Sequence, residues 1–217
     1  DGFTVAIVGS DGSGKTTVCK KIIASVSQKV SIKYIYLGHG KSGAGAIFLF
    51  FLKSLSYLNR RTPRSLKYFE HLANLLIVCR RLYILILAKH YVSQGRLVCM
   101  DRFPQFNKPG VSDGTFFTNQ KRRWWSISYL IEMKVKRLAE QCRLDYVVHL
   151  HADREVLKER LLCGYDSNKI DQKSEAIDLF VQQLRSPKVK LDSGKLAPNS
   201  LLGIIIPKFF QLVGDRD

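Results

Sequence analysis

Acidic residues are scarce in this sequence, and long apolar runs are missing. The 217 residues include 18 Asp and Glu against 35 Lys and Arg, which gives a formal net charge of +17 at pH 7. The longest apolar stretches, residues 44–52 and 82–88, are much shorter than the roughly 20 residues that a membrane-spanning helix needs. We therefore do not expect an integral membrane protein. The charge predicts an anionic partner: a nucleotide, a nucleic acid, a phosphorylated sugar or an anionic membrane surface.

The cysteines do not have the spacing of a zinc-binding or disulfide motif. The sequence has an odd number of cysteines and no CxxC pair; the five are Cys19, Cys79, Cys99, Cys142 and Cys163. Zinc fingers and disulfide scaffolds need such spacing, so both are disfavoured and a reducing compartment is favoured. No signal-peptide pattern precedes the first expected strand, which predicts a cytoplasmic protein and leaves room for a native segment before the first residue.

The remaining composition is that of a folded protein. Apolar residues make up 46% and charged residues 24%, and 217 residues suit one domain, 1–217, with a sizeable core. The basic excess is concentrated in residues 53–143, which carry 18 Lys and Arg against 5 Asp and Glu. Residues 144–217 carry 11 of each. A binding surface for an anionic partner and a solvated basic face both account for this concentration.

Short β-rich segments alternate with longer helical ones along the chain. Strands are predicted at Phe3–Val8, Ile32–Leu37, Leu97–Met100, Tyr146–Leu150 and, from a weaker pattern, Val189–Leu191. Helices are predicted at 15–28, 46–58, 66–93, 125–142, 154–164, 171–185 and 199–213. Several strands are apolar at consecutive positions, which is typical of strands covered on both faces of a parallel sheet. The alternation predicts an α/β fold: a three-layer sandwich with a five-stranded parallel sheet flanked by helices.

The clearest motif follows the first strand. Residues 9–16 read Gly-Ser-Asp-Gly-Ser-Gly-Lys-Thr and match G-x-x-x-x-G-K-[ST] at every fixed position. A strand precedes the motif and an apolar-periodic helix follows it, as a phosphate-binding P-loop requires. The glycines let backbone N–H groups point at phosphate oxygens, and the helix adds the partial positive charge of its N-terminus. Lys15 can then reach the β- and γ-phosphates of ATP, and the Thr16 hydroxyl can ligate Mg²⁺.

The sequence around this loop resembles that of thymidylate kinases, a family of P-loop nucleoside-monophosphate kinases. Residues 8–17 carry the resemblance, and residues 94–103 (Gln-Gly-Arg-Leu-Val-Cys-Met-Asp-Arg-Phe) are similar to the family's second signature, a strand ending in Asp-Arg-aromatic. Residues 150–185 resemble, more weakly, its strand, arginine-bearing helix and lid. The resemblance implies a nucleotide-kinase fold with a lid. It also implies an ATP site formed by Gly9, Asp11, Gly12, Ser13, Gly14, Lys15, Thr16 and Thr17.

Asp101 and Arg102 stand at the carboxyl end of a predicted strand, where wound sheets place their ligands. An acid at this point can hold the hydration shell of Mg²⁺ or orient the attacking oxygen, so Asp101 joins Thr16 as a candidate metal residue. An arginine can bridge donor and acceptor phosphates and neutralise the charge that develops during transfer. Asp101, Arg102 and Lys15 are therefore predicted catalytic residues. A surface Asp–Arg pair that caps the strand is the structural alternative.

Arg80 and Arg81 interrupt an otherwise apolar helical stretch. Adjacent residues project about 100° apart on a helix, so the two side chains do not share one buried face. Thymidylate kinases carry an arginine about this far before the Asp-Arg motif. The resemblance implies that Arg81 first, or Arg80 second, grips the monophosphate of the acceptor; alternatively, either stem lies along the core and reaches solvent. Asp11 either forms the turn of the loop or, as the resemblance implies, accepts a hydrogen bond from an acceptor hydroxyl.

The predicted lid, residues 161–177, departs from the family pattern. Thymidylate kinases without an arginine in the P-loop usually supply arginines from the lid, but this lid has none and offers Lys169 and Lys173. Arg160, on the helix that enters the lid, keeps the family position and is a further catalytic candidate. Lysine lacks the bidentate fork of arginine. Either Lys169 and Arg160 suffice, with Lys169 contacting the substrate, or transfer is slow, or the substrate is unusual.

The predicted acceptor-binding region departs further from the pattern of thymidylate kinases. It covers residues 38–94. A glycine-rich stretch at 38–45 is interpreted as a flexible loop, and a Phe- and Leu-rich segment at 46–58 as a core helix, with a membrane-facing helix as the alternative. Residues 103–121, rich in Pro, Gly, Asn and Asp, predict a long functional loop. The cations and indoles of Lys121–Trp125 suit an anionic membrane interface, an aromatic acceptor or an exposed helix start.

Two classes of function fit these residues. The first is an ATP-dependent, Mg²⁺-requiring kinase, a phosphotransferase that resembles thymidylate kinase and acts on a nucleoside monophosphate or a related small phosphorylated acceptor. In a variant of it, the acceptor is a sugar, a sugar phosphate or a glycolipid. The second is a non-catalytic ATP-binding module that docks on an anionic membrane or on nucleic acid. The intact residues 14–16 and 101–102 favour the enzyme, with ATP and a small anionic acceptor as its partners. Peripheral contact with an anionic membrane and a homodimer stay open, and nucleic acid is disfavoured.

Overall fold

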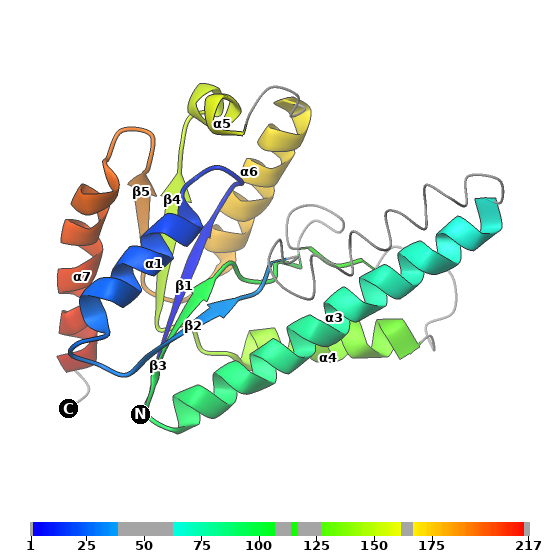
Figure 1. The fold of residues 1–217 in the computed structure, drawn as a ribbon, viewed down its shortest axis with the longest axis horizontal. Helices are drawn as coiled ribbons and strands as arrows, with labels where there is room; N and C mark the ends of the chain where they lie inside the picture. Colours follow the sequence, from blue (N-terminus) through cyan, green and yellow to red (C-terminus); the bar gives the residue numbers. More distant parts are fainter. Residues whose placement is uncertain (1, 39–62, 107–113, 117–126, 162–166, 215–217) are drawn as a thin grey trace.

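Five parallel strands form the central layer of the computed structural model, which describes residues 2–38, 63–106, 114–116, 127–161 and 167–214 (Figure 1). The strands are β1 (Phe3–Gly9), β2 (Ile32–Tyr36), β3 (Leu97–Asp101), β4 (Tyr146–His151) and β5 (Lys188–Asp192). Their order across the sheet is β2-β3-β1-β4-β5, and every pairing is parallel. The carboxyl ends of all five strands therefore meet at one edge, with β1 between β3 and β4.

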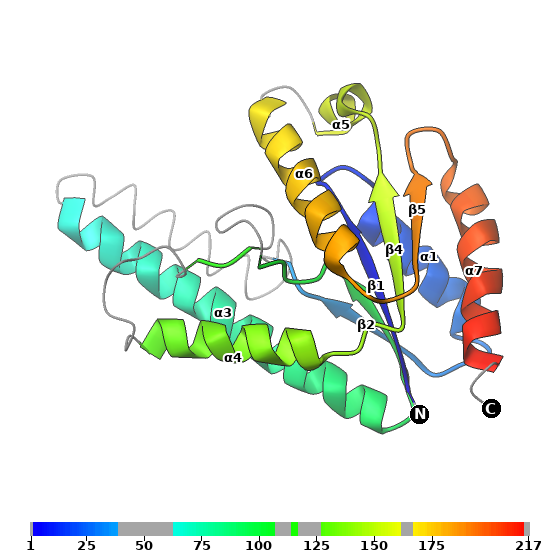
Figure 2. The ribbon, with the colours of Figure 1, turned by 180° about the vertical axis from the view of Figure 1, so that it is seen from behind.

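Helices cover both faces of this sheet. They are α1 (Lys15–Val26), α3 (Pro63–Ser93), α4 (Ile127–Gln141), α5 (Arg154–Arg160), α6 (Ser167–Gln183) and α7 (Pro198–Gly214). α1 and α7 pack on one face, whereas α3, α4 and α6 pack on the other (Figure 1, Figure 2). α3 is the longest, with 31 residues, and its amino-terminal half extends well beyond the sheet, beside α4 (Figure 2).

The central strand β1 shows why the sheet is covered on both sides. All of its residues are buried, and successive side chains point to opposite faces. Val5 and Ile7 join the core under α1 and α7. Ala6 and Val8 join the core under α3, α4 and α6. The consecutive apolar positions that predict a parallel sheet thus contribute to two separate cores.

The predicted α/β sandwich with a five-stranded parallel sheet is confirmed. Each end of each strand lies within one residue of its predicted position, including the weakly patterned β5. The six helices named above correspond to six of the seven predicted ones, and the predicted helix at 46–58 lies outside the described residues. Within the described ranges, no helix has the length and apolarity needed to cross a bilayer.

The predicted boundaries fail mainly around the lid. α5 ends at Arg160 instead of continuing to 164, and α6 begins at Ser167 instead of 171. Most of the segment predicted as a lid, 161–177, is therefore the first half of a packed helix. The physical reason is that Ile170 and Ile177, seven residues apart on one side of α6, are both buried.

The long loop predicted at 103–121 is only partly described. Residues 103–106 and 114–116 are neither helix nor strand, as expected, and the rest of this loop lies outside the described residues. The same holds for residues 39–62 of the acceptor region and for Lys121–Trp125.

Candidate active site

The glycine-rich loop joins β1 to α1 at the carboxyl edge of the sheet. Gly14 has a φ of +84°, a value that favours glycine, and stands at the amino terminus of α1. A Cβ on Gly9 would lie 2.4 Å from the Leu150 carbonyl oxygen, so β4 leaves room only for glycine there. Lys15 is buried, and its Nζ donates a 2.5 Å hydrogen bond to the Ser10 carbonyl oxygen across the loop. The loop therefore combines a tightly curled backbone with a cation, which suits a row of phosphate oxygens.

Asp101 ends β3 directly beside this loop. Its Oδ2 accepts hydrogen bonds from the Thr16 hydroxyl at 2.6 Å and from the Tyr34 hydroxyl at 2.9 Å. Partial desolvation of the Tyr34 side chain and the negative charge of Asp101 raise the pKa of the tyrosine, so its hydroxyl stays a donor. Thr16 and Tyr34, from α1 and β2, thus fix one oxygen of the Asp101 carboxylate.

The other carboxylate oxygen of Asp101, Oδ1, indicates that a ligand binds at this position. The residue is fully buried, and Oδ1 has no hydrogen-bond partner among the described residues. Leaving a buried carboxylate oxygen unsatisfied is costly. A carboxylate beside a threonine hydroxyl is a donor set that suits Mg²⁺, which usually keeps several waters and phosphate oxygens as its other ligands. No group of three or more His, Cys, Asp or Glu able to hold a metal is found in the part of the chain that the structure describes. Thr16 and Asp101 therefore fit a magnesium site whose remaining ligands would be waters and the phosphate oxygens of a bound nucleotide.

Arg102 has an unusual backbone conformation. Its φ is +74°, a left-handed value that costs a residue with a side chain about 1–3 kcal/mol. Its N–H donates to the Ile7 carbonyl oxygen of β1 at 3.0 Å, which holds this turn in place. The guanidinium reaches the P-loop, where Nη2 donates to Asp11 Oδ1 at 2.9 Å. Such strain concentrates at functional positions, where the surrounding structure maintains it.

Asp11 is held from two sides. Lys173 on α6 donates from Nζ to Oδ2 at 2.6 Å, while Arg102 binds Oδ1. Burial opposes ionisation of Asp11, but the hydrogen bond from Lys173 and the charges of Arg102 and Lys173 outweigh it and hold the pKa of Asp11 well below its ordinary value. The ionised carboxylate thus fastens α6 to the phosphate loop.

Arg160, the last residue of α5, contacts the loop as well. Its Nη1 donates to the Gly12 carbonyl oxygen at 3.3 Å and its Nη2 donates to the Ser193 carbonyl oxygen at 2.8 Å, just after β5. Lys169, the predicted substrate contact of the lid, is exposed on α6. The lysine of α6 that reaches the loop is Lys173, one turn further along the helix.

The side chain of Arg80 extends from α3 to the end of β2. It donates to the Gly38 carbonyl oxygen at 2.6 Å and to the Tyr36 carbonyl oxygen at 3.1 Å. Its guanidinium carbon is 5.8 Å from the centroid of the Tyr36 ring, and that of Arg102 is at the same distance from this ring. Tyr36 therefore brings Arg80 and Arg102 into one cationic array beside the P-loop.

Arg81 has different surroundings. It is only 3% exposed, so its side chain does not run along the core to solvent. Its Nη1 donates to the Gly114 carbonyl oxygen at 3.0 Å, and its guanidinium carbon lies 5.2 Å from the centroid of the Phe116 ring. The backbone N–H of Phe116 in turn donates to the Glu132 carboxylate on α4 at 2.7 Å. Arg81 is thus directed toward the loop predicted at 103–121.

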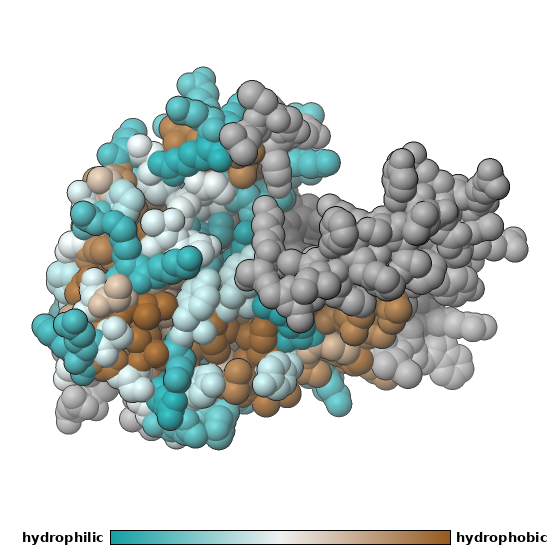
Figure 3. Space-filling view, in the orientation of Figure 1, coloured by the Kyte–Doolittle hydropathy of each residue, from teal (hydrophilic) through white to brown (hydrophobic). Residues whose placement is uncertain are grey.

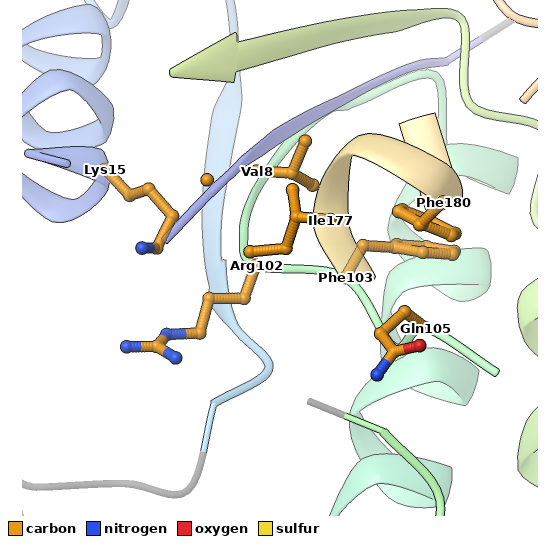
Figure 4. Close-up of a pocket in the computed structure, with 8 residues that line it drawn as sticks. Val8, Lys15, Arg102, Phe103, Gln105, Ile177 and Phe180 are labelled. Carbon is orange, nitrogen blue, oxygen red and sulfur yellow. The ribbon is translucent and has the colours of Figure 1, made fainter. Parts of the chain in front are cut away.

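A pocket lies between the P-loop, the end of β3 and α6 (Figure 4). The charged ends of Lys15 and Arg102 point to the same side of it, away from Phe103 and Phe180 (Figure 4). These two rings are stacked, with their centroids 6.0 Å apart, and Gln105 is buried near them. The pocket therefore has a cationic side and an aromatic side.

The sequence did not single out Tyr34, Tyr36 or Gln105. A signal existed for the tyrosines, because they alternate with Ile35 on a short strand and so share one side of it. Their register was not visible, however: Tyr36 lies opposite Asp101 only because β2 pairs with β3, far along the chain. Gln105 carries no comparable pattern.

Comparison with solved structures identifies the fold. Deoxyadenosine kinase from M. mycoides, with the products dCMP and a flexible dCDP bound, matches with a TM-score of 0.58 and 15% identity over 96% of this chain and 100% of that chain. Thymidylate kinase from Candida albicans matches with a TM-score of 0.55 and 17% identity over 97% of this chain and 93% of that chain. The chain has the fold of P-loop nucleoside and nucleoside-monophosphate kinases, and the resemblance to thymidylate kinases is confirmed at that level.

Comparison with known sequences finds similarity over only about half of the chain. No protein-family model matches the sequence. YghS of Escherichia coli (strain K12), an uncharacterized ATP-binding protein, is 30% identical over a 117-residue alignment that covers 49% of this chain and 49% of the relative. The chain thus spans about half the length of the curated relative that it matches.

Proposed function

We propose that this chain is an ATP-dependent kinase that requires Mg²⁺ and transfers the γ-phosphoryl group of ATP to a small phosphorylated acceptor. A nucleoside monophosphate is the first candidate. One observation carries the proposal: Lys15, Thr16, Asp101 and Arg102 converge at the carboxyl edge of β1 and β3, where a buried oxygen of Asp101 has no partner among the described residues. The kinase fold and the ATP-binding relative support it. The proposal treats residues 1–217 as one kinase domain.

The donor side binds ATP through the P-loop. Backbone N–H groups of Gly12, Ser13, Gly14 and Thr17 would bind phosphate oxygens, with Gly9 giving the loop its close approach to β4. Lys15 exchanges its bond to the Ser10 carbonyl oxygen for the β- and γ-phosphates. Thr16 and Asp101 would hold Mg²⁺, which, when bound, neutralises charge on the phosphate oxygens during transfer.

The acceptor side is assigned to the arginines. Arg102 lies between the two sides, because it contacts both Asp11 of the P-loop and the ring that it shares with Arg80. A monophosphate bound by Arg80 or Arg81 would therefore face the donor phosphates across Arg102. Asp11 serves first as the anchor of Lys173, because both of its carboxylate oxygens are engaged. An acceptor hydroxyl can reach it only as an additional partner.

Although the predicted lid has no arginine, other residues supply the positive charge that phosphoryl transfer needs. Lys173 and Arg160 bring positive charge to the loop from α6 and α5. Phosphoryl transfer depends on positioning and on charge neutralisation more than on covalent chemistry. A lysine supplies the charge without the bidentate geometry, so we expect a functional but modest rate.

Product detection tests the proposal. The purified chain is incubated with ATP, Mg²⁺ and, in separate reactions, nucleoside monophosphates, nucleosides, sugars and sugar phosphates, with Lys15→Ala as the control. We expect a phosphorylated product from a monophosphate acceptor that the control does not form. Transfer to a sugar or a sugar phosphate would keep the kinase and change its acceptor. ATP binding without transfer to any acceptor would contradict the proposal and favour the non-catalytic module.

A further inference from the structure

Tyr34 is a partly exposed residue whose hydroxyl reaches the buried carboxylate of the candidate site. It lies on β2, the edge strand of the sheet, and is 40% exposed. Its hydroxyl nevertheless donates at 2.9 Å to Oδ2 of Asp101, which is fully buried. The two hydrophobic cores of the sheet, as the described residues form them, do not include this ring. Packing therefore does not explain why a tyrosine stands here, and the bond to Asp101 is the feature to account for.

The two oxygens of the Asp101 carboxylate have different surroundings. Each carboxylate oxygen has two lone pairs that accept hydrogen bonds. On Oδ2, the hydroxyls of Thr16 and Tyr34 occupy both of them. Oδ1 accepts no hydrogen bond from the described residues. The two hydroxyls thus fix the rotation of the carboxylate and leave Oδ1 as the oxygen that can bind a cation.

Asp11, the other carboxylate of the site, shows why the donors to Asp101 matter. Cations bind both oxygens of Asp11, with Arg102 on Oδ1 and Lys173 on Oδ2. The donors to Asp101, by contrast, are neutral hydroxyls. A neutral donor orients a carboxylate and leaves its negative charge in place, whereas an ion pair neutralises that charge. Asp101 is therefore the carboxylate of the two that can attract a divalent cation.

We propose that Tyr34 is a positioning residue for the metal ion: by occupying Oδ2, it makes Asp101 a ligand through one oxygen and so favours Mg²⁺ over Ca²⁺. The inference rests on the proposed function, in which Thr16 and Asp101 hold Mg²⁺. Mg²⁺ requires nearly ideal octahedral geometry, whereas Ca²⁺ also accepts a carboxylate through both of its oxygens. Thr16 can serve both partners, because a hydroxyl oxygen binds a cation through a lone pair while its hydrogen stays bonded to Oδ2.

Loss of the Tyr34 hydroxyl would leave one lone pair of Oδ2 without a donor. An unsatisfied acceptor on a fully buried group is costly, so the carboxylate would rotate or bind the cation through both oxygens. Both responses disfavour Mg²⁺, whereas the second suits Ca²⁺. Replacing a residue that orients a metal ligand typically lowers metal affinity about 10–100-fold. Because Tyr34 is partly exposed and water can replace part of its hydrogen bond, we expect a loss of about tenfold for Mg²⁺.

Nucleotide binding measures this role without turnover. Calorimetry on the full chain gives the dissociation constant of the non-hydrolysable ATP analogue adenylyl imidodiphosphate in Mg²⁺, in Ca²⁺ and in EDTA. The constant in EDTA divided by that in a metal ion reports how strongly the metal and the nucleotide are coupled. Tyr34→Phe should reduce this ratio about tenfold for Mg²⁺ and less than about threefold for Ca²⁺. The constant in EDTA should stay within about twofold, because the P-loop is unchanged.

Tyr83→Phe is the matched control, since it removes the same hydroxyl from a tyrosine that is 65% exposed and lies outside the candidate site. Tyr83 is on α3, whose part of the surface appears as a brown band in Figure 3. All three constants should be unchanged in this variant. Tyr34→Leu, which also lacks the hydroxyl, should repeat the result of Tyr34→Phe and carries the test if that variant does not fold. Circular dichroism checks the fold of each variant.

The outcomes distinguish this inference from the proposed function. If Mg²⁺ does not strengthen nucleotide binding to the unchanged protein, the proposed magnesium site is wrong and the inference fails with it. If Mg²⁺ strengthens binding and the Tyr34 variants keep the full ratio, the inference alone is overturned. An equal loss in Mg²⁺ and in Ca²⁺ would also overturn it, because Tyr34 would then support the site without selecting the ion. So would an equal loss in Tyr83→Phe.

Discussion

The proposed donor and acceptor sides of the site differ in whether a recognisable sequence motif marks their residues. On the donor side, the P-loop places Asp11, Lys15 and Thr16 within a few positions of each other, and one strand, β3, adds Asp101 and Arg102. On the acceptor side, the hydrogen bonds of Arg80 and Arg81 join residues 33 to 44 positions apart. Two short motifs, the P-loop and the Asp-Arg pair at the end of β3, thus mark the donor side, although their contacts span 85 and 91 positions. No such motif marks Arg80 and Arg81, and packing of α3 against β2 and the loop defines the acceptor side. Four experiments can break or sharpen this contrast.

Removal of the P-loop lysine should have the largest effect. We expect Lys15→Ala to lose phosphoryl transfer by at least about 10²–10³-fold in kcat, because it removes a charged donor to the transferring group. The loop glycines are unchanged, so the fold should persist in circular dichroism. Turnover near that of the unchanged protein would show that the donor assignment is wrong.

Loss of an acceptor arginine should have the next largest effect. Arg81→Ala should lower kcat/KM for the acceptor about ten- to a hundredfold, since a hydrogen bond to a charged group contributes about 1.5–3 kcal/mol. The dissociation constant of ATP should change little. Steady-state kinetics with each substrate varied in turn, together with binding of ATP, measure the two effects.

Arg80→Ala is the companion variant, because Arg80 shares the Tyr36 ring with Arg102 while Arg81 faces Gly114. A larger effect for Arg80 would place the acceptor phosphate nearer Arg102. Since Arg81 is buried, thermal unfolding of both variants separates loss of binding from loss of stability. If both variants lose ATP affinity, or neither changes the acceptor kinetics, the division into two sides fails.

The two lysines of α6 should give a smaller effect. We expect Lys173→Ala to reduce kcat/KM about three- to tenfold, because it releases α6 from Asp11 and removes a partly exposed cation from the loop. Lys169→Ala, on the exposed part of the same helix, should change it by less than about twofold. Equal effects of the two substitutions would mean that the contact with Asp11 has no role in transfer.

The smallest effect is expected from salt. If the basic excess of residues 53–143 serves a small acceptor, binding to DNA, RNA or anionic vesicles should be weak and depend little on salt. Each neutralised phosphate releases counterions, so a log–log slope steeper than about −4 would indicate an extended polyanion. Such a slope would favour the binding module over the kinase.

The predicted lid shows why the sequence did not identify every residue of the candidate site. The absence of arginine from 161–177 was visible, and so were both lysines, but the sequence did not show that residues 167–177 belong to one helix, α6. A helix fixes which lysine faces the loop. The buried neighbours Ile170 and Ile177 set its rotation, and that rotation directs Lys173 to Asp11. Composition alone gave no reason to prefer Lys173 over Lys169.

The sequence by itself determined the α/β class, the five strands and the phosphate-binding loop, because apolar periodicity and backbone conformation are local properties of consecutive residues. It also located Asp101 and Arg102, since the end of a buried strand is recognisable from the residues before it. Only the tertiary structure decided that Tyr34 fixes Asp101, that Tyr36 joins Arg80 to Arg102 and that α3 leaves large apolar side chains such as Tyr83 exposed. These contacts depend on strand register and helix rotation. Both are set by how distant segments pack against one another, which no single stretch of sequence records.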